Sequence, residues 1–177
     1  MFNFRAVYFY FLAVKIILFQ FLKEIYFSTS YYNKSLKTKL PEQLYFYPNP
    51  FLLSSFVNQK IFTFKLSQIT INTFWTDHVN NEEEENLNSF FWLNLIDRKN
   101  DGLVIQKIID IWIKNNNQYT KKNWQNQKIS KRILAWILNA DIILNNADRS
   151  FRDNFFKSII TQVNHLKNNL NYENNPI

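Results

Sequence analysis

The chain has 177 residues, enough for one domain or for part of a larger one, and nearly half of them are apolar, so a folded core is expected. The absence of cysteine excludes disulfides and thiolate chemistry, and the single glycine, Gly102, argues against glycine-rich phosphate loops of the Rossmann or P-loop kind. The net charge of +7 favours an anionic partner: acidic polysaccharide, acidic lipid or nucleic acid.

Residues 1–30 are predicted to form an amphipathic N-terminal helix. The longest uncharged run, Ala6 to Val14, has nine residues, whereas a spanning helix needs about 20 apolar residues. The pattern favours a helix that packs on its own protein, or contacts a membrane surface through residues 1–27, over a true anchor. A true anchor is kept as an alternative because lysine side chains can reach the membrane interface. The polar residues that interrupt the apolar sequence are Arg5, Lys15, Gln20 and Lys23.

Residues 31–80 are predicted to form an extended arm with short strands. Three prolines in the run LPEQLYFYPNP favour an extended chain. Farther on, apolar and polar residues alternate between Phe62 and Asn72. A period of two with β-branched and aromatic residues is typical of strands.

Residues 81–177 carry a helical pattern that begins at the acidic run Glu82–Glu85, where carboxylates suit a helix N-terminus. The fourth expected helix is amphipathic, with Val163 in its apolar stripe and Thr161 and Asn164 among the residues that face away from it. The third carries apolar residues around its whole circumference, which indicates burial on every side. The four helices are expected at 84–99, 103–116, 129–145 and 151–172.

The predicted helices alternate between amphipathic and apolar all round. Arranged as hairpins, they would form the outer and inner layers of an α/α barrel or solenoid. We expect a mainly α protein whose last part is an incomplete α/α toroid, because two hairpins are too few to close a ring. The N-terminal helix and the short β-strand region precede it. No clear 34- or 40-residue repeat supports a helical repeat array instead.

In the predicted third helix, Arg132 lies within an otherwise apolar stretch. Trp136 and Asn139 lie within about 60° of it around the helix. A buried guanidinium without a partner costs several kcal/mol. Arg132 is therefore expected either to pair with a carboxylate such as Asp110 or Asp141, or to face a wet cavity that the strip lines.

The two histidines, His78 and His165, are too far apart in sequence to form a local pair of metal ligands. We therefore expect no metal site and no cofactor. Each histidine is interpreted as an ordinary surface or interface residue.

Four stretches, in order, resemble the N-terminal helical region of bacterial heparinase II/III family proteins, which are polysaccharide lyases and lyase-like proteins. In that family Leu-His-Ser-Phe precedes Trp-Leu, a Trp-Ile follows, and Trp, Arg and Trp have the spacing of Trp124, Arg132 and Trp136. A Gln-x-x-x-Leu comes next, as in Gln162 and Leu166. The stretches are NLNSFFWLNLIDRKNDG, IDIWIKNN, NWQNQKISKRILAWI and DRSFRDNFFKSIITQVNHL.

The resemblance covers roughly residues 4–172, because the preceding helix and proline-rich arm also fit the family's layout. One departure is visible, since Asn88 stands where the family has its histidine. The role of that histidine is therefore not carried over to this chain.

The resemblance implies an α/α toroid followed by a large β-sandwich, with the substrate in the cleft between them. It also implies β-elimination of uronic-acid-containing polysaccharide, in which a base removes the proton α to the carboxylate and an acid protonates the leaving oxygen. The family's catalytic tyrosine and histidine residues come from segments that this chain does not contain. In the family, an asparagine that polarises the substrate carboxylate comes shortly after the closing helix. In this chain Asn174 or Asn175 is the candidate for that position. We expect a truncated or split N-terminal portion that has no catalytic residue, is inactive alone and lacks its C-terminal β-sandwich partner.

The expected contribution of this chain is a wall that faces an acidic polysaccharide. Aromatic rings stack on sugars and an arginine fork binds uronate. Trp112 and Trp75 are expected in the core instead. The candidates for the wall are Arg132, Trp136, Trp124, Trp92 and Asn139.

Two other functional classes are kept as alternatives. A nucleic-acid-binding helical module would explain the net charge, but the lysines are scattered rather than gathered on one face, which disfavours nucleic acid. A membrane-surface scaffold would explain the N-terminal helix. A cytoplasmic or membrane-peripheral location is favoured, with a periplasmic one as the alternative.

Overall fold

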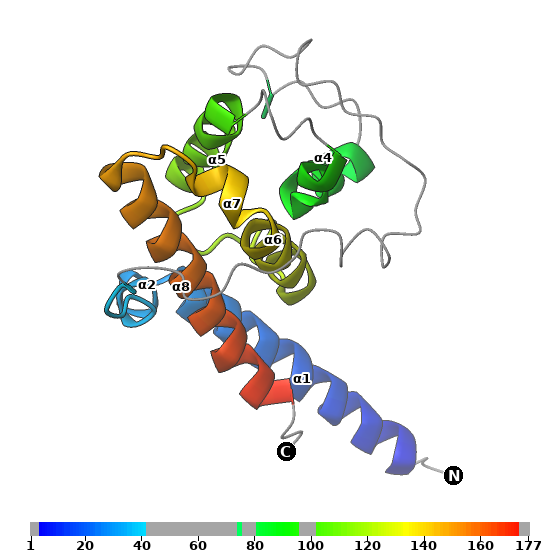
Figure 1. The fold of residues 1–177 in the computed structure, drawn as a ribbon. Coiled ribbons are helices and arrows are strands. Elements are labelled where there is room, and N and C mark those ends of the chain that lie inside the picture. The colour runs from blue at the N-terminus through cyan, green and yellow to red at the C-terminus, as the bar shows by residue number, and fades with distance from the viewer. Residues whose placement is uncertain (1–3, 42–73, 76–80, 96–101, 174–177) are drawn as a thin grey trace.

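The computed structural model describes residues 4–41, 74–75, 81–95 and 102–173 (Figure 1). Within these ranges the chain is mainly α-helical and no strand is assigned. The strands predicted between Phe62 and Asn72, and His78, lie outside the described residues. The elements are α1 (Phe4–Ser28), α2 (Ser30–Ser35), α4 (Asn81–Ser89), the 3-10 helix η2 (Phe91–Leu95), α5 (Gly102–Asn115), α6 (Asn126–Leu138), α7 (Ala140–Leu144) and α8 (Arg149–Glu173).

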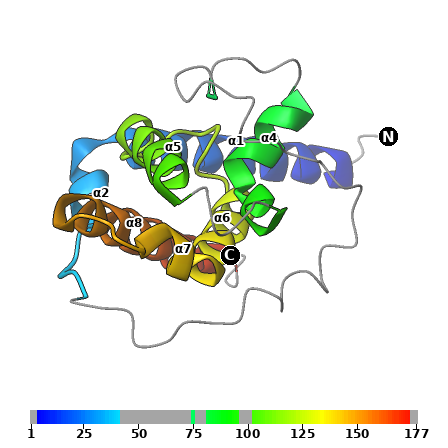
Figure 2. The same cartoon turned by 45° about the horizontal axis from the view of Figure 1, so that its top comes forward.

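Helix α6 lies at the centre of the helical body. It packs against α4, η2, α7 and α8, and α8 in turn packs against α5. Figures 1 and 2 show these helices grouped together, while α1 runs away from them toward the N-terminus. The main core is rich in large aromatic rings, each of which contributes about 1.5–3 kcal/mol when it is fully buried.

The prediction of one continuous helix over 84–99 is wrong, because α4 ends at Ser89. Phe90 adopts a left-handed backbone with φ 59°, which an α-helix of L-residues does not accommodate. Such a conformation costs about 1–3 kcal/mol in a residue other than glycine. Burial of the Phe90 ring offsets this cost, since its centroid lies 5.7 Å from that of Trp112 and 5.1 Å from that of Trp136.

The single helix predicted over 129–145 is divided at Asn139 into α6 and α7. The Asn139 side-chain amide donates to the carbonyl of Ala135 at 2.8 Å and to Asn94 Oδ1 at 2.9 Å. These bonds hold Asn139 at the junction between the two helices. The predicted burial on every side is also wrong, because Leu134 is 50% exposed on a face that its neighbours leave uncovered.

Helices α5 and α8 confirm the predictions over 103–116 and 151–172 to within a few residues. The predicted faces of α8 need a correction. Thr161, expected to face away from the core, is buried, whereas Val163, expected in the apolar stripe, is 42% exposed. The reason is that α8 packs against both α5 and α6, which turns polar residues of α8 inward.

The N-terminal helix is present, but the prediction that it packs on its own protein is wrong for most of its length. Side chains from Arg5 to Leu22 are exposed, and Phe27 near the C-terminal end is buried. Residues 31–35 also differ from the predicted extended arm, since they belong to α2. Thr29 caps this helix, because its Oγ1 accepts from the Tyr32 backbone N–H at 3.2 Å.

Candidate functional site

Arg132 lies at the centre of a hydrogen-bond network that joins three parts of the fold. Its Nε donates to Gln162 Oε1 at 2.7 Å, Nη1 donates to the Asn88 carbonyl at 3.1 Å, and Nη2 donates to the Asn123 carbonyl at 3.0 Å. All three acceptors are neutral. The guanidinium is fully buried and does not line a cavity, and its partners among the described residues are these neutral oxygens, so neither the expected carboxylate pair nor the expected position facing a wet cavity is found there.

The Trp112 ring supplies the remaining stabilisation of this charge. The Arg132 guanidinium carbon lies 4.1 Å from the ring centroid, a cation–π arrangement. Trp112 is itself oriented by a bond from its Nε1 to Asn88 Oδ1 at 2.8 Å. Burial lowers the pKa of Arg132 to about 9, so the guanidinium still carries its charge at neutral pH.

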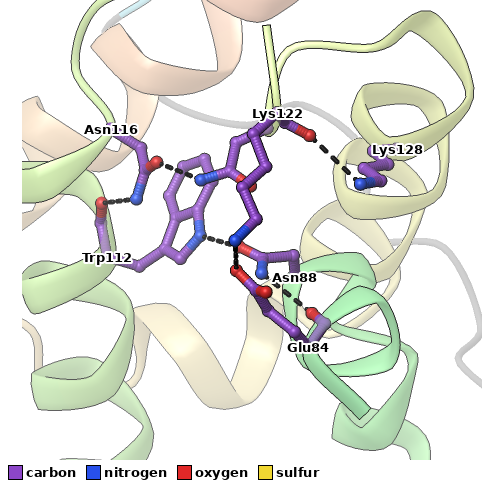
Figure 3. Close-up of polar contacts among 7 residues, drawn as sticks. Glu84, Asn88, Trp112, Asn116, Lys122 and Lys128 are labelled. Carbon is purple, nitrogen blue, oxygen red and sulfur yellow. Dashed lines mark hydrogen bonds and ion pairs between the residues drawn. The ribbon is translucent and has the colours of Figure 1, made fainter. Parts of the chain in front are cut away.

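The loop between α5 and α6 is fastened to the same network (Figure 3). Asn116 Nδ2 donates to the Trp112 carbonyl at 3.0 Å, and Asn123 Nδ2 donates to Asn116 Oδ1 at 2.7 Å. On the outer side, Lys122 Nζ lies 2.6 Å from Glu84 Oε1. The loop is therefore held against α4 and α5 at several points.

A cavity of about 110 Å³ lies where this loop, α8 and the chain after α2 meet. Most of the residues that line it are polar, two of them are lysines, and none carries a carboxylate side chain. Ammonium groups and amide N–H groups donate to carboxylate and hydroxyl oxygens. The lining includes Lys37, Asn116, Gln118, Trp124, Lys157 and Ser158.

Arg132 does not line this cavity, but it is connected to two of its walls. Gln162 accepts from Arg132 and donates through Nε2 to Ser158 Oγ at 3.0 Å, which lies in the α8 wall. On the loop side, Asn123 accepts from Arg132 through its carbonyl and donates to Asn116, which also lines the cavity. The buried cation is therefore placed to position side chains around the cavity, through one intervening residue on each side.

The five predicted site residues do not form an exposed wall, because each is at most 4% exposed. Trp124 alone among them lines the cavity. Trp136 packs in the aromatic core, Trp92 donates through Nε1 to the Leu87 carbonyl at 3.1 Å, and Asn139 lies at the α6–α7 junction. These three side chains and Arg132 support the fold in this structure.

The predictions for Trp112 and Trp75 as core residues fit their surroundings. Trp112 is 1% exposed, and Trp75, partly buried, packs against the main core. The Trp75 Nε1 donates to the Ile108 carbonyl at 3.1 Å.

The cavity residues that the sequence analysis missed come from separate segments. Lys37 follows α2, Asn116 directly follows α5, and Lys157 and Ser158 belong to α8. The one local signal was the run of amides from Asn115 to Gln118, which is polar enough to line a cavity. The sequence holds no signal that this run of amides lies close to Lys37 and Lys157, because their proximity depends on how α2 and α8 pack.

His165 was expected at a surface or interface, but it is 1% exposed. Asn169 Nδ2 donates to both His165 Nε2 at 2.8 Å and the His165 carbonyl at 3.0 Å. The neutral ring therefore carries its proton on Nδ1, which lies 2.8 Å from Tyr32 Oη. Burial lowers the pKa of His165 to about 4, so the ring is a neutral fastening between α2 and α8 at physiological pH.

Comparison with known proteins adds no relative to this description. A scan against protein-family models, a search of curated proteins and a search of solved structures each gave no match to this chain. In the described part of the chain, no group of three or more His, Asp or Glu side chains is arranged to hold a metal ion.

Proposed function

We propose that this chain is the N-terminal helical part of a heparinase II/III-like protein, and that its own role is to bind acidic sugar without catalysing its cleavage. The observation that carries the proposal is the lysine-bearing cavity whose two walls are positioned by Arg132. Uronate units carry carboxylate and hydroxyl oxygens, which can accept hydrogen bonds from the lysine and amide groups of this lining.

The residues that carry the family resemblance support this proposal by their convergence. Trp112, Arg132 and Gln162 come from three different helices, and Arg132 contacts both of the others directly. Trp136 packs against Trp112, with 5.5 Å between ring centroids. A pattern spread over a long stretch of sequence therefore corresponds to one physical unit, as a shared family core would require.

The finer architecture belongs to the same proposal. Helices α4, α5, α6 and α8 are the first helices of an incomplete α/α toroid. β-Elimination then depends on tyrosine and histidine groups from further toroid helices and a β-sandwich, which act together with this chain. The chain alone binds sugar and gives no unsaturated uronate product.

Binding of a glucuronate oligosaccharide, followed by isothermal titration calorimetry on the detergent-solubilised chain, tests the proposal. The substitution Lys157→Gln removes one cavity ammonium group and is expected to weaken binding about three- to tenfold. Lys167→Gln is the matched control, because Lys167 is exposed on the same helix but does not line the cavity.

A neutral glucose oligosaccharide of the same length should bind more weakly than the uronate form. The proposal is wrong if the two sugars bind alike, or if Lys157→Gln and Lys167→Gln have the same effect. Strongly salt-dependent binding of duplex DNA, insensitive to Lys157→Gln, would favour the nucleic-acid alternative.

A further inference from the structure

Helix α1 exposes large apolar side chains on every side. Four consecutive residues, Tyr8, Phe9, Tyr10 and Phe11, are each 62–69% exposed. Successive helical residues point about 100° apart, so these four cover the whole circumference. Soluble surfaces rarely carry a continuous apolar area of this extent. A helix of this kind needs an apolar environment around it, rather than a partner along one face.

The dimensions of α1 match those of a bilayer. The segment Arg5–Ser28 is apolar and long enough to cross a membrane, and none of its apolar window is buried in the protein. At 1.5 Å per residue its 24 residues extend about 36 Å, against about 30 Å for the hydrocarbon core.

The polar residues of α1 do not form the continuous polar face that an interfacial helix needs. Arg5 and Lys23 lie on the same side, five full turns apart, but Leu12, Ile16 and Phe19 occupy that side between them. A helix lying flat with this side toward water would expose these three residues. The distribution therefore favours a spanning orientation.

Lys15 near the middle of α1 is the main cost of that orientation. Its long side chain can extend toward the interface. The Leu, Ile, Val and Phe residues of the same helix each favour insertion and together outweigh one central lysine.

Basic groups gather where α1 joins the helical body. Lys121 Nζ lies 2.7 Å from Glu24 Oε1 near the C-terminal end of α1. Lys128 Nζ donates to the Lys122 carbonyl at 3.1 Å, which brings two further ammonium groups to the same loop. Lys34, Lys37 and Lys39 follow α1 in sequence, whereas Arg5 is the one basic side chain of the described residues at the opposite end.

We propose that α1 crosses a lipid bilayer and holds the helical body against the anionic, cytoplasmic leaflet. The lysines at the base of α1 complement the negative headgroups of that leaflet. Tyr26 and Tyr31 lie near this interface, and Tyr8 and Tyr10 near the other, which are the depths that tyrosine prefers.

The first test is extraction of the full chain from vesicles of phosphatidylcholine and phosphatidylserine. The chain should stay in the membrane through high salt and alkaline carbonate. Leu18→Arg places a second charge near the bilayer centre and should reduce the carbonate-resistant fraction at least about tenfold. Leu134→Arg is the matched control, since Leu134 is similarly exposed but lies on α6, and it should change nothing.

A second test separates spanning from surface binding. The chain has no cysteine, so Arg5→Cys and Tyr31→Cys each introduce one thiol, at opposite ends of the apolar segment. A membrane-impermeant maleimide should label the two sites from opposite sides of sealed bacterial membrane vesicles. Labelling of both from one side, release by carbonate, or equal effects of Leu18→Arg and Leu134→Arg would each overturn the proposal.

Discussion

Arg132 keeps its charge without a carboxylate partner among the described residues. Three neutral oxygens and the Trp112 ring surround it, and the cost of burial is expressed as a pKa lowered to about 9. Because the fork geometry of arginine reaches all three acceptors at once, lysine is not an equivalent replacement. The residue acts as a link between α4, α6, α8 and the loop that lines the cavity.

Replacement of Arg132 by methionine should destabilise the fold by about 3–5 kcal/mol, because it leaves buried acceptors at Gln162, Asn88 and Asn123 without donors. Denaturant unfolding followed by tryptophan fluorescence measures this change. Arg152→Met is the control, since the exposed Arg152 donates through Nη2 to the Leu144 carbonyl and its replacement should cost well under about 1 kcal/mol. Equal midpoints for the two variants would contradict the proposed link.

At the scale of elements, the short helix α2 is held to α8 largely through side chains. Tyr32 contacts His165, Asn164 Nδ2 donates to the Leu36 carbonyl at 2.8 Å, and Phe27 packs against both rings. A six-residue helix has little stability of its own. Its position therefore depends on the neutral state of the His165 ring.

The attachment of α2 should weaken in acid. The pKa of His165 is about 4 in the folded chain and about 6.5 when unfolded, so the unfolded state binds more protons between these values. This difference in the pKa of His165 contributes about 3 kcal/mol to the free energy of unfolding. The contribution is complete above pH 6.5 and is lost as the pH falls toward 4.

Denaturant unfolding at intervals from pH 7 to pH 4 measures this dependence. His165→Gln should have a flatter stability profile over that range than the unmodified chain, while both still respond to carboxylate titration. Profiles of the same slope would show that His165 does not carry the acid sensitivity.

At the scale of the whole molecule, α1 and the helical body have different surroundings. The body has two buried clusters of side chains, and α1 contributes Phe27 to one of them. The side chains from Arg5 to Leu22 are exposed, and Figure 1 shows the N-terminal part of α1 projecting from the body. The body should therefore keep its fold when the projecting part is absent.

Deletion of residues 1–22, which retains Phe27, should yield a soluble, folded chain whose melting temperature lies within a few degrees of the full-length value. Circular dichroism and gel filtration check both properties. An insoluble or molten product would instead mean that the projecting part of α1 belongs to the core.

The sequence by itself determined the helical class, the extents of α5 and α8 and the apolar character of α1, because these follow from local hydrophobic periodicity. Tertiary structure alone decided that Phe90 breaks a helix, that His165 faces inward and that Arg132 is paired with neutral groups. It also decided which amides and lysines share a cavity. Periodicity defines the faces of a helix, but the partners of a buried polar group are distant in sequence, and packing selects them.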